Sequence, residues 1–121
     1  MKLKFIPSRY EIFPELKEKF SLDLALEWRR NNNKGEPLFC IKVNGNVMHK
    51  DGSLEYEALP SSRTEDFLKN TRFPLKKAQA LANKHIPKYM KKYFMQPHTA
   101  KFLKEHENTN WAKEIKKKFN L

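Results

Sequence analysis

The clearest structural signal in the chain is the stretch Leu38-Phe39-Cys40-Ile41-Lys42-Val43-Asn44-Gly45-Asn46. Phe39, Ile41 and Val43 alternate with other residues, which is the period of a strand with one buried face. Asn44-Gly45 follows at once, and both residues accept the positive φ angles of a type I′ turn. The stretch therefore predicts a β-hairpin whose second strand covers residues 46–50.

Strand signals continue on both sides of this hairpin. Upstream, Leu22, Leu24, Leu26 and Trp28 alternate over residues 22–28, and a polar loop follows at 29–37. Downstream, Asp51-Gly52 supplies a second turn before residues 54–59. Residues 22–59 are therefore expected to form an antiparallel β-meander of three to four strands.

Helical patterns flank the meander. Residues 14–20 predict a short N-terminal helix with Pro14 in its first turn, and residues 3–6 predict a short strand. Residues 73–119 predict C-terminal helices, with a kink or break near His85-Ile86 because Pro87 cannot donate a backbone hydrogen bond. A cap at Asn108 or Thr109 should begin the last helix. The expected fold class is therefore α+β, with the small sheet packed against these helices.

The expected core combines the alternating strand residues with one helix face. That face carries Leu75, Ala78, Ala82, His85, Tyr89 and Tyr93 at steps of three or four residues. The residues expected to supply much of the core are Leu22, Leu24, Leu26, Trp28, Phe39, Ile41, Val43, Leu75, Ala78, Ala82, Tyr89 and Phe102.

Length and composition limit the class of protein. With 121 residues and 39% hydrophobic content, the chain fits one folded domain over residues 1–121. No apolar run approaches the roughly 18–20 residues of a membrane span. A single cysteine and no secretory signal favour a cytoplasmic location. The 20 lysines against five arginines, with ten asparagines, are typical of an AT-rich genome such as many phages have, which would place the protein in the host cytoplasm.

The net charge of +11 is confined to one half of the sequence. Residues 1–66 carry 11 basic and 11 acidic side chains, whereas residues 67–121 carry 14 basic and three acidic ones. Such asymmetry indicates an interaction surface for a polyanion. The lysines expected to form it recur at helical spacing, and we call them the predicted lysine surface: Lys76, Lys77, Lys84, Lys88, Lys91, Lys92, Lys101 and Lys104.

The sequence favours a non-enzymatic nucleic-acid-binding protein that contacts phosphates with little sequence preference, because lysine offers compact charge without reading bases. An alternative is a small inhibitor or adaptor, of phage origin on this composition, that docks its basic face on an acidic host protein. A third hypothesis is a metal-dependent nuclease that uses Glu55 and Glu57 on one strand face. No residue set indicates a catalytic site, a resident metal or a cofactor, and the oligomeric state is left open.

The turn and helix positions also resemble a known layout. Ile41-Lys42-Val43-Asn44-Gly45, the turn at Asp51-Gly52, and Phe73-Pro74-Leu75-Lys76-Lys77-Ala78 opening a helix are similar to small three-strand-plus-helix DNA-binding modules. The arm-binding domains of tyrosine integrases are an example. The likeness covers residues 38–86 at most, and the gap of 20 residues between sheet and helix is longer than in that pattern. It implies DNA binding but assigns no individual residue.

Overall fold

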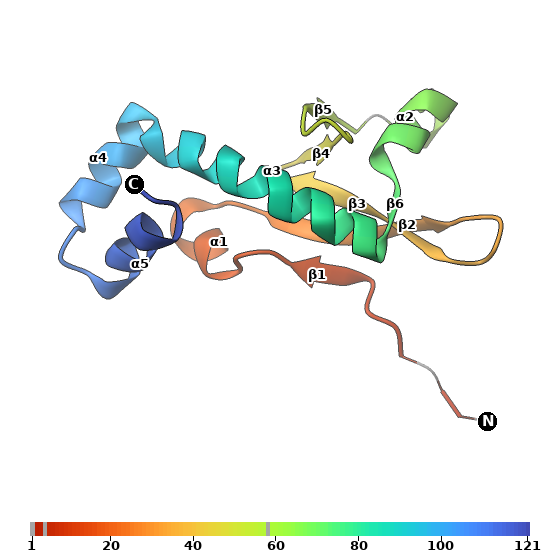
Figure 1. The fold of residues 1–121 in the computed structure, drawn as a ribbon, viewed down its shortest axis with the longest axis horizontal. Coiled ribbons are helices and arrows are strands. Elements are labelled where there is room, and N and C mark those ends of the chain that lie inside the picture. Colours follow the sequence, from red (N-terminus) through yellow and green to blue (C-terminus); the bar gives the residue numbers. More distant parts are fainter. Residues whose placement is uncertain (1, 4, 58) are drawn as a thin grey trace. The chain divides into compact units, whose positions relative to one another are not determined.

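The computed structural model of the chain describes residues 2–3, 5–57 and 59–121, and it consists of two compact units (Figure 1). The first unit, Met1–Ala82, holds an antiparallel sheet, and the second, Asn83–Leu121, is helical. Helix α3 (Leu75–Met95) begins in the first unit and ends in the second. The α+β class is confirmed.

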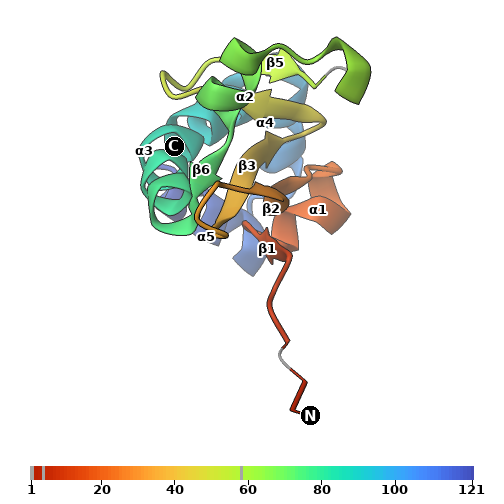
Figure 2. The same cartoon turned by 90° about the vertical axis from the view of Figure 1, so that its right-hand side faces the viewer.

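The sheet has six strands. The order is β1-β2-β3-β4-β5, with antiparallel pairing throughout, and β6 pairs with β3 next to the start of α3 (Figure 2). The predicted meander is confirmed as β2 to β5, and its Asn44-Gly45 turn has positive φ at both residues. The strands are β1 (Arg9–Glu11), β2 (Leu24–Asn31), β3 (Pro37–Val43), β4 (Asn46–Met48), β5 (Leu54–Tyr56) and β6 (Phe73–Pro74).

The register of β2 on β3 gives the sheet one apolar face and one face that mixes charged side chains with the buried Ala25 and Cys40. Leu26 lies opposite Ile41 and Trp28 opposite Phe39, so these side chains share a face. Side chains of the intervening residues, such as Glu27 and Lys42, point to the opposite face. The alternation in sequence thus positions both the core and a network of ion pairs.

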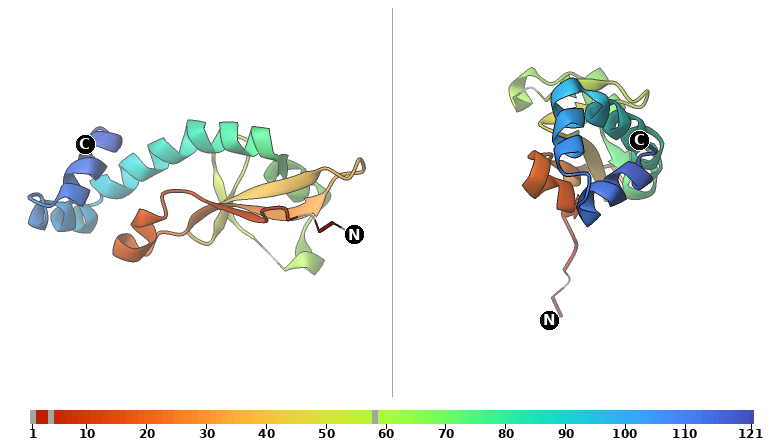
Figure 3. Two further views of the ribbon diagram at one scale, coloured as in Figure 1. Left: turned by 90° about the horizontal axis from the view of Figure 1, so that it is seen from below. Right: turned by 90° about the vertical axis from the view of Figure 1, so that its left-hand side faces the viewer.

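The helices begin where the sequence supplies caps. Thr64 and Thr109 each accept a hydrogen bond from a backbone N–H three residues further on, which confirms Thr109 as the cap of the last helix. Figure 3 follows the chain through the last two helices. The remaining helices are α1 (Glu15–Phe20), the 3₁₀ helix η1 (Pro60–Ser62), α2 (Glu65–Thr71), α4 (Pro97–Glu105) and α5 (Asn110–Lys118).

One prediction of local structure is wrong, and of the kink or break predicted near His85-Ile86 the break is absent. The described residues of the expected strand at 3–6 are not in a strand, and Lys4 lies outside the described residues; the first strand begins at Arg9. Helix α3 also continues through Pro87 without a break. The missing bond affects only the carbonyl of Asn83, an exposed residue that water can satisfy, and Pro87 itself is exposed.

The predicted core is mostly buried, with one helix face displaced. Trp28, Leu75, Tyr89 and Phe102 are only half-buried, and the other eight predicted residues are buried. The buried stripe of α3 runs through Ala78 and Ala82 to Ile86, Met90 and Phe94, at constant steps of four residues. The tyrosines at 89 and 93 therefore flank this stripe instead of forming it.

Candidate nucleic-acid interface

Helix α3 presents lysines on the side away from its buried stripe. Lys84, Lys88 and Lys92 are exposed and recur every four residues, just as Ile86 and Met90 recur on the buried side. Residues two apart on a helix point in nearly opposite directions, so burial of one set exposes the other. The predicted stripe along this helix is therefore a solvent-facing surface.

The remaining residues of the predicted lysine surface are also exposed, but they lie in different places. Lys76 and Lys77 stand in the first turn of α3, within the first unit. Lys91 stands on the second-unit part of α3, and Lys101 and Lys104 on α4. The second unit therefore holds six of the eight predicted lysines.

The charge of the second unit is not balanced internally. Residues 83–121 contain ten lysines and three glutamates, which gives a net charge of +7. Among the described residues, its lysines other than Lys118 form no ion pair, and α3 contains no acidic residue along its whole length. The second unit therefore carries exposed positive charge that is available to an external anion.

The first unit treats its charges differently. Arg9 pairs with Glu11, Asp23 and Glu27, and Arg29 pairs with Glu27 and Glu57. Arg9–Glu27 joins β1 to β2, whereas Arg9–Glu11 and Arg29–Glu27 each lie within one strand. The arginines they contain are occupied by structural contacts, whereas the lysines of the second unit are not.

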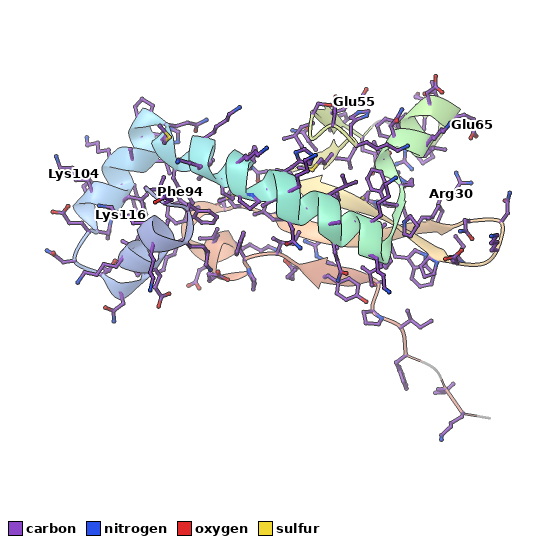
Figure 4. All side chains as sticks on the ribbon, in the orientation of Figure 1. Arg30, Glu55, Glu65, Phe94, Lys104 and Lys116 are labelled. Carbon is purple, nitrogen blue, oxygen red and sulfur yellow. The ribbon has the colours of Figure 1, made fainter. Side chains whose placement is uncertain are left out.

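Three lysines from three helices surround an apolar groove in the second unit. Lys91 of α3, Lys104 of α4 and Lys116 of α5 are the exposed lysines of its lining, and the groove has a volume of about 590 Å³. Figure 4 labels Lys104, Lys116 and Phe94, which come from these three helices. Lys116 lies outside the predicted lysine surface, because its position in the last turn of α5 fits a contact with the negative end of the helix dipole as well as it fits a phosphate contact.

The aromatic residues between the lysines are engaged in packing. The ring of Phe94 lies 5.5 Å from that of Phe119, centroid to centroid, and both residues are buried. Trp111 packs 5.9 Å from Phe102 and 5.4 Å from His106. Burial raises the pKa of the half-buried Tyr89. Phe94 and Phe119 are therefore too buried for base stacking, whereas Tyr89, Phe102 and Trp111 are half-buried.

The nuclease hypothesis places Glu55 and Glu57 together, but the two carboxylates contact different partners. Glu55 lies 2.6 Å from Nε2 of His49, whereas Glu57 is surrounded by three arginines. Among residues 2–3, 5–57 and 59–121, no three His, Cys, Asp or Glu side chains gather in a way that could hold a metal ion. The geometry gives this hypothesis no support.

Cys40 lies in the sheet and not in a reactive site. Burial is the main cause that raises the pKa of its thiol, and a hydrogen bond from Nε of Arg29 to Sγ opposes this effect in part.

No helix in the described part of the chain is long and apolar enough to cross a membrane.

No family model, no curated protein and no solved structure matches this chain.

Proposed function

We propose that this protein binds nucleic acid through the exposed lysines of its C-terminal helical unit and has no enzymatic role. The observation that supports this proposal is the segregation of charge: the second unit has a net charge of +7, and nine of its lysines are exposed without an ion pair to any described residue. Phosphates would supply the missing countercharge and release bound counterions.

The expected binding has little sequence preference. The second unit contains no arginine, the side chain that most often reads guanine edges with two hydrogen bonds. Lysine places a single flexible ammonium group against a phosphate. The proposed location is the cytoplasm, where the buried thiol of Cys40 would remain reduced.

Charge reversal on α3 tests the proposal. The triple variant Lys84→Glu, Lys88→Glu and Lys92→Glu should weaken binding to a labelled 30-nucleotide DNA, single- or double-stranded, by about tenfold or more at moderate salt. For the duplex, the slope of log K against log salt concentration should fall in magnitude by roughly 2.7, or ~0.9 for each phosphate that the variant no longer neutralises. Fluorescence anisotropy across a salt series measures both quantities.

A matched triple variant separates this surface from net charge in general. Lys34, Lys50 and Lys69 are exposed residues of the first unit, and their reversal to glutamate changes the net charge by the same amount. This control should retain most of the affinity. Equal losses of affinity in the two triple variants, or an unchanged dissociation constant in the α3 variant, would contradict the proposed surface.

A further inference from the structure

The groove in the second unit exposes apolar surface that the nucleic-acid proposal does not use. Phe94 and Leu103 are buried at its base, whereas Met95 is 65% exposed and Leu121 is 42% exposed. All of its lining residues belong to Asn83–Leu121. A volume of about 590 Å³ falls within the roughly 300–1,000 Å³ range of ligand sites.

Filling this groove with an apolar group is favourable. At ~30 Å³ per molecule, its volume corresponds to about 20 waters, and most of the surface that they would touch is hydrocarbon. Release of such water and burial of Met95 and Leu121 would each favour association. The interior therefore fits large aliphatic or aromatic side chains.

The charged residues that line the groove favour a negatively charged ligand. Lys91, Lys104 and Lys116 border it from three separate helices, against the single acid Glu107. Ammonium groups distributed in this way complement several carboxylates that flank an apolar anchor on both sides. A fatty acid brings only one carboxylate and would leave the other lysines without a partner.

Two other occupants fit less well. The N-terminal residues Leu3, Phe5 and Ile6 are exposed and apolar, but Lys2 and Lys4 lie beside them in sequence, so the same segment of a second copy would meet like charge. An unpaired base would need an open ring for stacking, and Phe94 is buried against Phe119.

We propose that this groove is a docking site for an acidic peptide segment of a partner protein, with one or two large apolar side chains in the groove and flanking carboxylates on Lys91, Lys104 and Lys116. The mode is that of a short amphipathic segment seated in a groove. The site shares Lys91 and Lys104 with the predicted lysine surface, but Lys84, Lys88 and Lys92 do not line it, so the α3 triple variant leaves its lining unchanged.

The test uses two synthetic peptides and the full chain. The first peptide, DEELFEED, carries a Leu-Phe anchor, and the second, DEESGEED, has the same charge without it. Anisotropy of labelled peptide gives the affinity, and ¹⁵N–¹H spectra show which amides respond. We expect the anchored peptide to bind about tenfold more tightly than the peptide without the anchor, with shifts centred on Met95, Leu103 and Leu121.

Matched variants assign the binding to the groove. Lys104→Glu with Lys116→Glu should weaken the anchored peptide about tenfold, whereas Lys101→Glu with Lys113→Glu, on the same helices but outside the groove, should have a much smaller effect. Met95→Gln keeps size and charge but removes apolar contact, so it should reduce affinity about threefold or more.

Several results would overturn the docking site. The first two are equal affinities of the two peptides and an unchanged affinity of the anchored peptide for the Met95→Gln variant. The third is an equal loss of affinity in the two double lysine variants. The fourth is a set of amide shifts at the groove that oleate or a dT oligonucleotide causes and the anchored peptide does not. The α3 triple variant keeps the two proposals apart. It should lose affinity for nucleic acid and keep its affinity for the anchored peptide, so each proposal can be tested even if the other one fails.

Discussion

The carboxylate of Glu57 is the centre of the most buried ionic cluster in the first unit. It forms ion pairs with Arg29, Arg63 and Arg72, and its side chain is 11% exposed. The side chain of Arg72 is only 2% exposed, and among the described residues its Nε has no hydrogen-bond partner. Glu57 is therefore the charge that makes burial of this guanidinium tolerable.

Glu57→Gln should destabilise the protein by about 3–5 kcal/mol, because it leaves Arg72 buried without a countercharge. Glu55→Gln, two residues away, is the control: Glu55 is 54% exposed and, among the described residues, pairs with His49 alone, so its loss should cost ~0–1 kcal/mol. Urea denaturation measures both free energies of unfolding. Equal effects of the two substitutions would show that the arginine cluster does not depend on Glu57.

At the scale of the element, helix α3 lacks one backbone hydrogen bond because Pro87 has no N–H to donate. A proline within a helix destabilises the folded state by about 3 kcal/mol relative to alanine. Proline also restricts the unfolded chain, and replacing it with alanine gives up roughly 0.4–1 kcal/mol of that stabilising effect. Pro87→Ala should therefore raise the free energy of unfolding by about 2 kcal/mol. Pro97→Ala supplies the comparison, because Pro97 opens α4, where a missing N–H costs nothing. Destabilisation by Pro87→Ala in urea would mean that the helix requires its proline.

The elements predicted from sequence are those with strong local signals. Alternation and the Asn44-Gly45 turn predict β2 to β5, and four-residue spacing of lysines predicts the exposed face of α3. Strands β1 and β6 have three and two residues, too few for any period, and β6 forms only because Phe73 pairs with the distant Phe39. The convergence of Lys91, Lys104 and Lys116 likewise depends on how three helices pack, which no local pattern records.

On the scale of the whole molecule, the two units handle charge in opposite ways. The first unit has 15 basic and 11 acidic side chains, for a net charge of +4. Among the described residues, four of its five arginines form ion pairs within partly buried networks, namely Arg9, Arg29, Arg63 and Arg72. The second unit has +7 and leaves its described lysines unpaired apart from Lys118. Salt screens exposed charges more strongly than buried ones, so it should affect the second unit more than the first.

Moderate salt should therefore stabilise the free protein while it weakens the proposed binding. Along α3, Lys88 repels Lys84, Lys91 and Lys92 at helical spacing, and three like-charge pairs at ~0.2–0.5 kcal/mol each cost about 1 kcal/mol at low ionic strength. Raising KCl from 20 to 300 mM shortens the Debye length to below ~10 Å and should recover much of this cost as a higher Tm. Lys88→Gln removes all three like-charge pairs, so its Tm should respond less to salt than that of Lys34→Gln, which changes an exposed lysine of the first unit. A Tm that falls with KCl would show instead that the ion pairs of the sheet dominate the electrostatics of the molecule.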